Sequence, residues 1–192
     1  SIIINLMQIS IIKESDNNEQ RVSASPESVK TMSRLGAKVL VEKNAGILSG
    51  FTNNDFESAG AQIVSHADCF KSDIILCVRM PSKEDIRNFK KRSILIGLLN
   101  PFSNKDFHRN LNDNFITSLA MELIPRISRA QSMDVLSSQA NLAGYRSVID
   151  AANHFGKAFP MMMTAAGRVN PAKVMVLGVG VAGLQAIATA KR

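Results

Sequence analysis

The chain has 192 residues, 45% of them hydrophobic, which is enough for a buried core and excludes a disordered or collagen-like protein. Its formal net charge of +7 is concentrated in residues 81–192, which hold 15 basic and 7 acidic side chains, against 8 and 9 in residues 1–80. The densest basic run, residues 83–92, also contains Glu84 and Asp85 and only one aromatic side chain. We therefore interpret the excess charge as suited to an anionic cofactor and an acidic remainder of the protein, and not to nucleic acid.

No segment has the features of a membrane span or a secretion signal. The longest apolar stretch near the N-terminus, residues 2–12, is interrupted by polar side chains, and a spanning helix needs about 20 apolar residues. We therefore expect a cytosolic protein without a membrane span. Cys69 and Cys77 have neither metal-knuckle nor C-x-x-C spacing and are interpreted as buried, reduced thiols. The three histidines also lack ligand spacing, so we predict no metal.

Strands and helices alternate along the first part of the chain, which predicts a parallel sheet with helices on both faces. Ser25 as N-cap, Pro26 at the first helical position and Glu27 in the first turn begin a helix that Gly36 ends. Strands are expected at residues 8–12, 37–41, 61–64, 73–78, 94–99 and 115–120, a short helix at residues 55–59, and an extension ahead of the first strand in the residues before Met7.

One long helical stretch is predicted from Ser132 to Phe155, where apolar residues recur at helical spacing. Gly144 interrupts this pattern and should weaken the helix by about 1 kcal/mol relative to alanine. We divide the chain into an N-terminal α/β domain at residues 1–130, a helical interdomain connection at residues 131–163, and a third segment at residues 164–192.

The third segment contains the pattern of a dinucleotide-binding turn. Residues 174–177 are predicted to form a buried strand, and Gly178, Gly180 and Gly183 follow in a G-x-G-x-x-G loop that opens a helix. Glycines at these positions allow the tight turn and let the backbone approach a pyrophosphate. The fold also needs an acidic residue about 20 positions later to hold a ribose hydroxyl, and only nine residues follow Gly183. We therefore expect an α/β protein in which a doubly wound domain is joined by a long helix to the truncated start of a Rossmann NAD-binding domain.

Two polar segments are candidates for ligand contacts. Residues 13–29 follow the first strand, and in parallel sheets ligands bind at the carboxyl ends of strands, where Arg21 could clamp a carboxylate or phosphate. The alternative for this segment is a solvated loop that leads into a capped helix. In the second segment, Gln131, Asp134 and Ser137 would share a helical face that could hold a primary carboxamide, with Arg126 upstream to pair the acid.

The second segment also has a purely structural interpretation. Ser128 and Gln131 have the spacing of a capping box, and Asp134 could simply complement the helix dipole. The residues alone leave both interpretations open.

Three strings together resemble the family of alanine dehydrogenase and proton-translocating nicotinamide nucleotide transhydrogenase. The string K-E-x-x-x-N-x-x-R-V-x-x-S-P-x-x-V at residues 13–29 is similar to the family's N-terminal signature, and residues 125–145 and 161–183 resemble its transhydrogenase branch. In the alanine dehydrogenase branch a lysine and a histidine handle the keto acid. The matching positions here hold Cys77 and Asn100, which cannot donate or accept a proton as that chemistry requires.

The resemblance implies the NAD(H)-binding component of a proton-pumping transhydrogenase. Hydride would pass directly between NAD(H) on this protein and NADP(H) on a partner component, while a membrane component moves the proton. It further implies a homodimer at the cytoplasmic face of the inner membrane, and a 192-residue fragment that is inactive alone. The alternatives are an NAD-dependent dehydrogenase of alanine type and a non-catalytic docking fragment.

The resemblance also implies the residues of the NADH site. Gln131 and Asp134 would act by positioning the nicotinamide, without acid–base chemistry, and Arg126 would anchor the carboxamide side together with Asp134. Ser137 would add a hydrogen bond. The backbone of the segment before Gln131 would line the nicotinamide and its ribose, and the glycine loop would hold the pyrophosphate. The implied site comprises Arg126, Ile127, Ser128, Arg129, Gln131, Asp134, Ser137, Gly178, Gly180, Val181 and Gly183.

Overall fold

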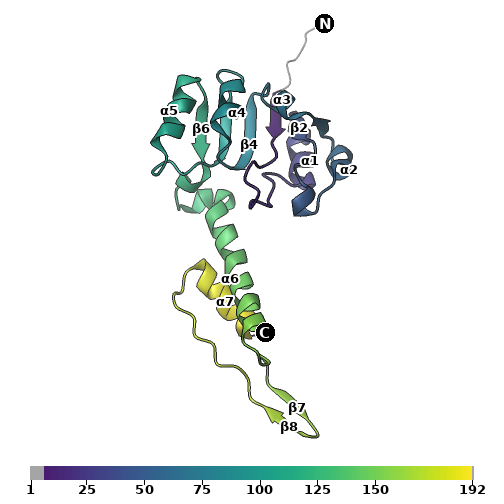
Figure 1. Ribbon diagram of the computed structural model, residues 1–192, viewed down its shortest axis with the longest axis vertical. Coiled ribbons are helices and arrows are strands. Elements are labelled where there is room, and N and C mark those ends of the chain that lie inside the picture. Colours follow the sequence, from purple (N-terminus) through teal and green to yellow (C-terminus); the bar gives the residue numbers. More distant parts are fainter. Residues whose placement is uncertain (1–6, 192) are drawn as a thin grey trace. The chain divides into compact units, whose positions relative to one another are not determined.

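A computed structural model describes residues 7–191 and divides the chain into two compact units, with the boundary after Ile124 (Figure 1). The extension predicted before Met7 lies outside the described residues. The predicted three-way division placed its first boundary after residue 130, close to this one, and remains a prediction.

The first unit is built on a six-stranded sheet with the strand order β3-β2-β1-β4-β5-β6, in which every pairing is parallel. The predicted α/β fold with a parallel, doubly wound sheet is confirmed. Each predicted strand in this unit is present, with ends shifted by at most two residues. The strands are β1 (Gln8–Ile11), β2 (Lys38–Glu42), β3 (Gln62–Val64), β4 (Ile74–Arg79), β5 (Ile94–Leu98) and β6 (Thr117–Ala120).

Side-chain caps begin the helices of this unit. Ser25 accepts a hydrogen bond from Ser28 N and starts α1 (Pro26–Arg34), as predicted. Thr52 forms a capping box with Asp55, so α2 (Asn53–Ser58) begins two residues before its predicted start. The sequence analysis missed three further helices, whose N-caps are Ser65, Ser82 and Asn104: α3 (His66–Cys69), α4 (Lys83–Asn88) and α5 (Lys105–Asp113).

Strand register divides the core of the first unit between the two faces of the sheet. Ile11 lies beside Val41 and Leu76 in adjacent strands, and this face packs against Val29 of α1 and Phe56 of α2. Successive residues of a strand point to opposite faces. The residues on the other face therefore pack against α4 and α5 instead; they include Ile75, Leu95, Ile86 and Phe107.

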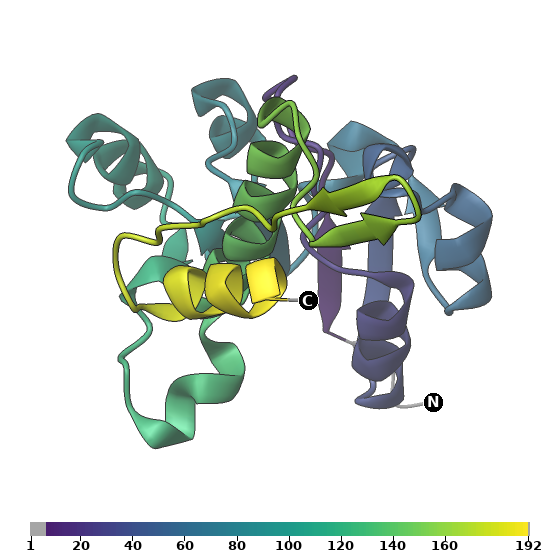
Figure 2. The same cartoon turned by 90° about the horizontal axis from the view of Figure 1, so that it is seen from below.

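Two short 3₁₀ helices, η1 (Ile47–Ser49) and η2 (Met121–Leu123), complete the first unit. The second unit begins with a third, η3 (Ser128–Met133), which is followed by α6 (Val135–His154). An antiparallel hairpin of β7 (Met162–Thr164) and β8 (Gly167–Val169) comes next, and α7 (Val181–Lys191) packs against α6 (Figure 2). The hairpin was not predicted from the sequence. Among residues 7–191, no helix combines the length and the apolar character that crossing a bilayer requires.

The strand predicted at residues 174–177 is wrong. This segment has no regular secondary structure, and Met175 and Leu177 are 84% and 90% exposed. A strand needs a neighbour that pairs with its backbone amides and carbonyls. The described residues of the second unit provide no such neighbour, because β7 and β8 pair with each other.

Candidate functional site

Asp134 begins the long helix α6 and is bound to Ser137. Its Oδ1 accepts a hydrogen bond from Ser137 N at 2.9 Å, and its Oδ2 accepts one from the Ser137 hydroxyl at 2.6 Å. The Ser137 hydroxyl, the Ser137 amide and the positive charge of Arg126 lower the pKa of Asp134, in that order of size. The structure therefore places an ionised carboxylate at a helix N-terminus, where negative charge is stabilised.

The segment before Asp134 differs from the predicted α-helix and from the predicted capping box. Residues 128–133 form the 3₁₀ helix η3, in which Asp134 N donates to the carbonyl of Gln131 at 3.2 Å. The residue that begins η3 is Ile127, and no side chain caps it. Because the α-helix begins only at Val135, Gln131 does not share one α-helical face with Asp134 and Ser137.

The other predicted residues of this segment are accessible to solvent. Ile127 is 54% exposed, and the remaining side chains of the group are exposed as well. They therefore remain available to a ligand or to a partner protein. The group consists of Arg126, Ile127, Ser128, Arg129 and Gln131.

The glycine-rich loop leads into α7 by a close turn. Gly178 has φ +101°, in the left-handed region that favours glycine. A β-carbon on Gly183 would overlap the carbonyl of Gly178, so the turn closes on itself at this point. At Gly180, by contrast, an added β-carbon would meet only open space. The first amides of α7, which starts at Val181, lack carbonyl partners within the helix and can bind an anion.

The second unit thus contains two groups of predicted site residues. Asp134 and Ser137 are joined by hydrogen bonds, and Gly178 and Gly183 meet in the turn before α7. Within residues 125–191, no described hydrogen bond joins the first group to the second. The link between them is the packing of α6 against α7, which includes a bond of 3.2 Å from Asn141 Nδ2 to Gln185 Oε1.

The first unit has a charged cluster where its strand order reverses, at the carboxyl ends of β1 and β4. The Glu14 carboxylate follows β1 and accepts hydrogen bonds from the amides of Val78 and Arg79 at 2.6 and 2.9 Å. Burial is the largest influence on Glu14 and raises its pKa, although these two hydrogen bonds oppose the effect. Glu14 therefore joins the two strands at the topological switch point, where ligands bind in open α/β sheets.

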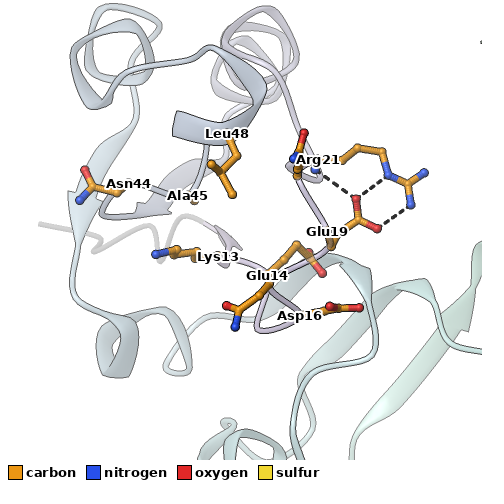
Figure 3. A pocket seen from close by; sticks show the side chains of 10 residues that line it. Lys13, Glu14, Asp16, Glu19, Arg21, Asn44, Ala45 and Leu48 are labelled. Atoms are coloured by element: carbon orange, nitrogen blue, oxygen red, sulfur yellow. Dashed lines mark hydrogen bonds and ion pairs between the residues drawn. The ribbon is translucent and has the colours of Figure 1, made fainter.

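Glu19 lies in the same cluster and is only 6% exposed. Its carboxylate accepts bonds of 2.7 Å from Arg21 Nε, Arg21 Nη2 and Arg79 Nε (Figure 3 shows the Arg21 contacts). The bond from Arg21 is the main reason that the pKa of Glu19 falls to about 2. The guanidinium that the sequence offered as an anion clamp is thus held by a carboxylate of its own loop. The importance of Glu19 was missed, although its position two residues before Arg21 was a usable signal.

A pocket adjoins this cluster (Figure 3). Its volume of about 110 Å³ is below the roughly 300 Å³ at which drug-sized ligand sites begin, so a dinucleotide does not fit. The residues that line it are Lys13, Glu14, Asp16, Asn17, Glu19, Gln20, Arg21, Asn44, Ala45 and Leu48.

The positions that would carry keto-acid chemistry hold no usable proton donor or acceptor. Cys77 is 4% exposed and donates its thiol hydrogen to the carbonyl of Ile96 at 3.5 Å, and burial raises its pKa. The Asn100 amide donates to the Glu122 carboxylate at 2.5 Å. Both cysteines are free and buried, as predicted, and burial raises the pKa of Cys69 to about 12. Within residues 7–191, no three His, Cys, Asp or Glu side chains gather in a group that could hold a metal ion.

Family models match almost the whole chain. Residues 10–143 match the alanine dehydrogenase/PNT N-terminal domain, and residues 147–192 match the C-terminal domain of the same family.

The curated relatives include both branches of this family. The chain is 50% identical to the first portion of the NAD(P) transhydrogenase subunit alpha of Rhodospirillum rubrum, over 97% of this chain and 50% of the relative. It is 35% identical to alanine dehydrogenase 1 of Staphylococcus aureus (strain Mu50), over 74% of this chain and 38% of that protein. The chain thus spans about half the length of the transhydrogenase subunit that it matches.

Solved structures give the same two branches. The crystal structure of a transhydrogenase from Sinorhizobium meliloti has a TM-score of 0.94 and 51% identity, and covers 96% of this chain and 55% of that one. An L-alanine dehydrogenase has a TM-score of 0.83 and 29% identity, over 96% of this chain and 52% of the other.

Proposed function

Because this chain belongs to the alanine dehydrogenase/nicotinamide nucleotide transhydrogenase (PNT) family, we propose that it forms part of the NAD(H) site of a transhydrogenase. The activity is direct hydride transfer between NAD(H) on this protein and NADP(H) on a partner component. The observation that carries the proposal is the absence of a proton-transfer group at Cys77 and Asn100, combined with the 50% identity to a transhydrogenase subunit.

The second unit has features that fit a dinucleotide. The turn at Gly178 requires glycine, the loop is open at Gly180, and it leads directly to the unpaired amides of α7. In this proposal Gly178, Gly180, Val181 and Gly183 hold the pyrophosphate.

Asp134 and Ser137 fit the carboxamide of a nicotinamide. Ser137 occupies two of the four acceptor sites on the Asp134 carboxylate, and the other sites can accept the two hydrogens of a carboxamide. The Ser137 hydroxyl oxygen can also accept a hydrogen bond. Arg126 helps to keep Asp134 ionised, and the exposed backbone of residues 127–129 lines the ring and its ribose.

The proposed role of the chain is to position the nicotinamide and to exclude water. The reduced nicotinamide, when bound, supplies the hydride. The chain needs no nucleophile, metal or acid–base group for this step, since two rings held at near-attack distance are sufficient. Gln131, which is exposed beside the Asp134–Ser137 pair in sequence, sets the approach of the partner's ring.

The proposed assembly has further components. A separate component binds NADP(H), a membrane component moves the proton, and two copies of this protein form a dimer at the cytoplasmic face of the inner membrane. The transhydrogenase relative is named as one portion of a subunit alpha, which supports the presence of other components.

A dehydrogenase of alanine type is the second candidate, and it is favoured by the 35% identity to alanine dehydrogenase 1. The two activities are separated by assays on the complete gene product. The transhydrogenase proposal predicts saturable binding of NADH in a calorimetric titration and no reduction of NAD⁺ by L-alanine. Alanine-dependent reduction of NAD⁺ would support the dehydrogenase, and no heat with NADH would leave only a docking role.

Gln131→Asn tests the positioning role directly. This change shortens the side chain by one methylene and keeps its amide, so NADH affinity should change little. Hydride transfer to NADP⁺ on the partner should slow at least about tenfold, which corresponds to about 1.4 kcal/mol of transition-state stabilisation. Gln62→Asn makes the same chemical change at an exposed position in β3 and should leave the rate unchanged. An unaltered transfer rate in Gln131→Asn would refute the role assigned to Gln131.

A further inference from the structure

Helix α6 contains a glycine at a position where a helix gains nothing from it. Gly144 should weaken the helix by about 1 kcal/mol relative to alanine. In the structure Gly144 is buried, and a β-carbon added to it would overlap the carbonyl group and the Cα of Ala182. Ala182 belongs to the first turn of α7. The glycine therefore allows the backbone of α7 to approach α6 more closely than any side chain would permit.

The contact at Gly144 is part of a continuous face between the two helices. Val148, four residues after Gly144, and Ala186, four residues after Ala182, are both buried. Residues four apart lie on the same side of a helix, so these pairs face the interface together. The hydrogen bond from Asn141 to Gln185 fixes the two helices relative to each other along this face.

The two ends that this contact relates are the ends that would hold the coenzyme. Asp134 caps α6 ten residues before Gly144, about 15 Å away along the helix axis. On the other side of the contact, Ala182 lies among the unpaired amides at the start of α7. Resting on the proposed function, we propose that Gly144 is a positioning residue, whose contact with Ala182 sets the distance between the nicotinamide-binding start of α6 and the pyrophosphate-binding start of α7.

A small displacement at Gly144 should have a specific consequence. Hydrogen bonds to the coenzyme tolerate only about 0.5 Å of variation in length, and an added methyl group displaces α7 by more than this. The pyrophosphate moves with α7, whereas the carboxamide partners Asp134 and Ser137 stay with α6. A ligand that reaches both ends loses contacts, and a ligand that lacks the nicotinamide does not.

Calorimetric titration of the complete gene product with NADH and with ADP-ribose tests this difference. ADP-ribose has the pyrophosphate and both riboses but no nicotinamide. In Gly144→Ala we expect the dissociation constant of NADH to rise about tenfold and that of ADP-ribose to change less than about threefold. The control is Ala143→Ser, which adds one heavy atom to an exposed position of the same helix and should change neither constant.

Each result decides between the possible roles of Gly144. Equal weakening of both ligands would show a role in packing alone and overturn the proposal, as would unchanged NADH affinity. Should Gly144→Ala fail to fold, Asn141→Ala replaces it, because it loosens the helix pair without adding atoms. About threefold weaker NADH binding with unchanged ADP-ribose binding is then expected, and unchanged NADH binding overturns the proposal. A wild-type protein that binds neither ligand would instead refute the proposed function itself.

Discussion

Replacing Glu19 with glutamine should destabilise the first unit in a way that depends on pH. The Glu19 side chain is 5% exposed and accepts hydrogen bonds from Arg21 and Arg79. These contacts lower its pKa from the ordinary value of 4.5 to about 2, chiefly through the bond from Arg21. Glutamine has nearly the same shape, but it carries no charge and one of its two oxygen acceptors is replaced by a donor.

The shift gives the size of the effect. A change from 4.5 to about 2 corresponds to about 3 kcal/mol of stability. The Arg21 and Arg79 side chains are 40% and 58% exposed, so solvent screening reduces the expected contribution to roughly 2 kcal/mol. Because the folded pKa is the lower one, this stability is fully present above about pH 4.5. It is lost as the pH falls through about 2.

Urea unfolding followed by circular dichroism measures this contribution. At about pH 7, Glu19→Gln should lower the free energy of unfolding by roughly 2 kcal/mol, and near pH 3 by less than about half of that. Glu57→Gln, at an exposed position of α2, is the matched control and should have little effect at either pH. The reasoning is refuted if Glu19→Gln behaves as the control does at neutral pH, or if its loss is as large near pH 3.

Three further predictions concern other groups. Asp134→Ala should lower the urea midpoint because α6 loses its N-cap, and Asp134→Asn should recover more than about half of that loss; equal losses would contradict the capping role. Burial lowers the pKa of His66, but hydrogen bonds to Glu42 and Asp85 outweigh it and raise the pKa above 6.5. The His66→Gln penalty, under about 1 kcal/mol because the ring is half exposed, should therefore be larger at about pH 5.5 than at about pH 8.5, and a penalty independent of pH would count against this. The Cys77 thiol, which is buried and has a raised pKa, should react with a thiol reagent at least about tenfold faster in urea than in the folded protein, and equal rates would contradict its burial.

The strands of the first unit could be predicted because their signal is local. Buried strands have continuous apolar runs, and Ser25 with Pro26 marks the start of α1 directly. The order of the strands could not be predicted, because β1 pairs with β2 and with the distant β4. The short helices α3 and α4 were missed because each depends on one capping serine.

Residues 174–177 show the opposite error, since an apolar run predicts a strand only when a pairing partner is present. The hairpin of β7 and β8 was missed because its two strands have three residues each and are exposed on both faces. Neither strand therefore has the alternation of buried and exposed residues that marks a half-buried strand.

The candidate site shows the same distinction between local and tertiary information. The proximity of Asp134 and Ser137 follows from their spacing of three residues, and the structure confirms it, although through an N-cap and not through a shared helical face. The close approach at Gly144 could not be predicted, since the group it meets, Ala182, is distant in the sequence. Its signal was a glycine inside a predicted helix, which indicates a packing reason when no turn is present.

Isotope transfer in the assembled complex tests the central claim most directly. The complete gene product and its NADP(H)-binding partner are mixed with NADH deuterated at the transferred position and with NADP⁺, and the NADPH formed is analysed by mass spectrometry. Direct transfer between two bound nicotinamides predicts that the NADPH retains the deuterium, and that unlabelled NADH in D₂O gives NADPH without deuterium. Loss of the label to water, or no NADPH at all, would contradict the account.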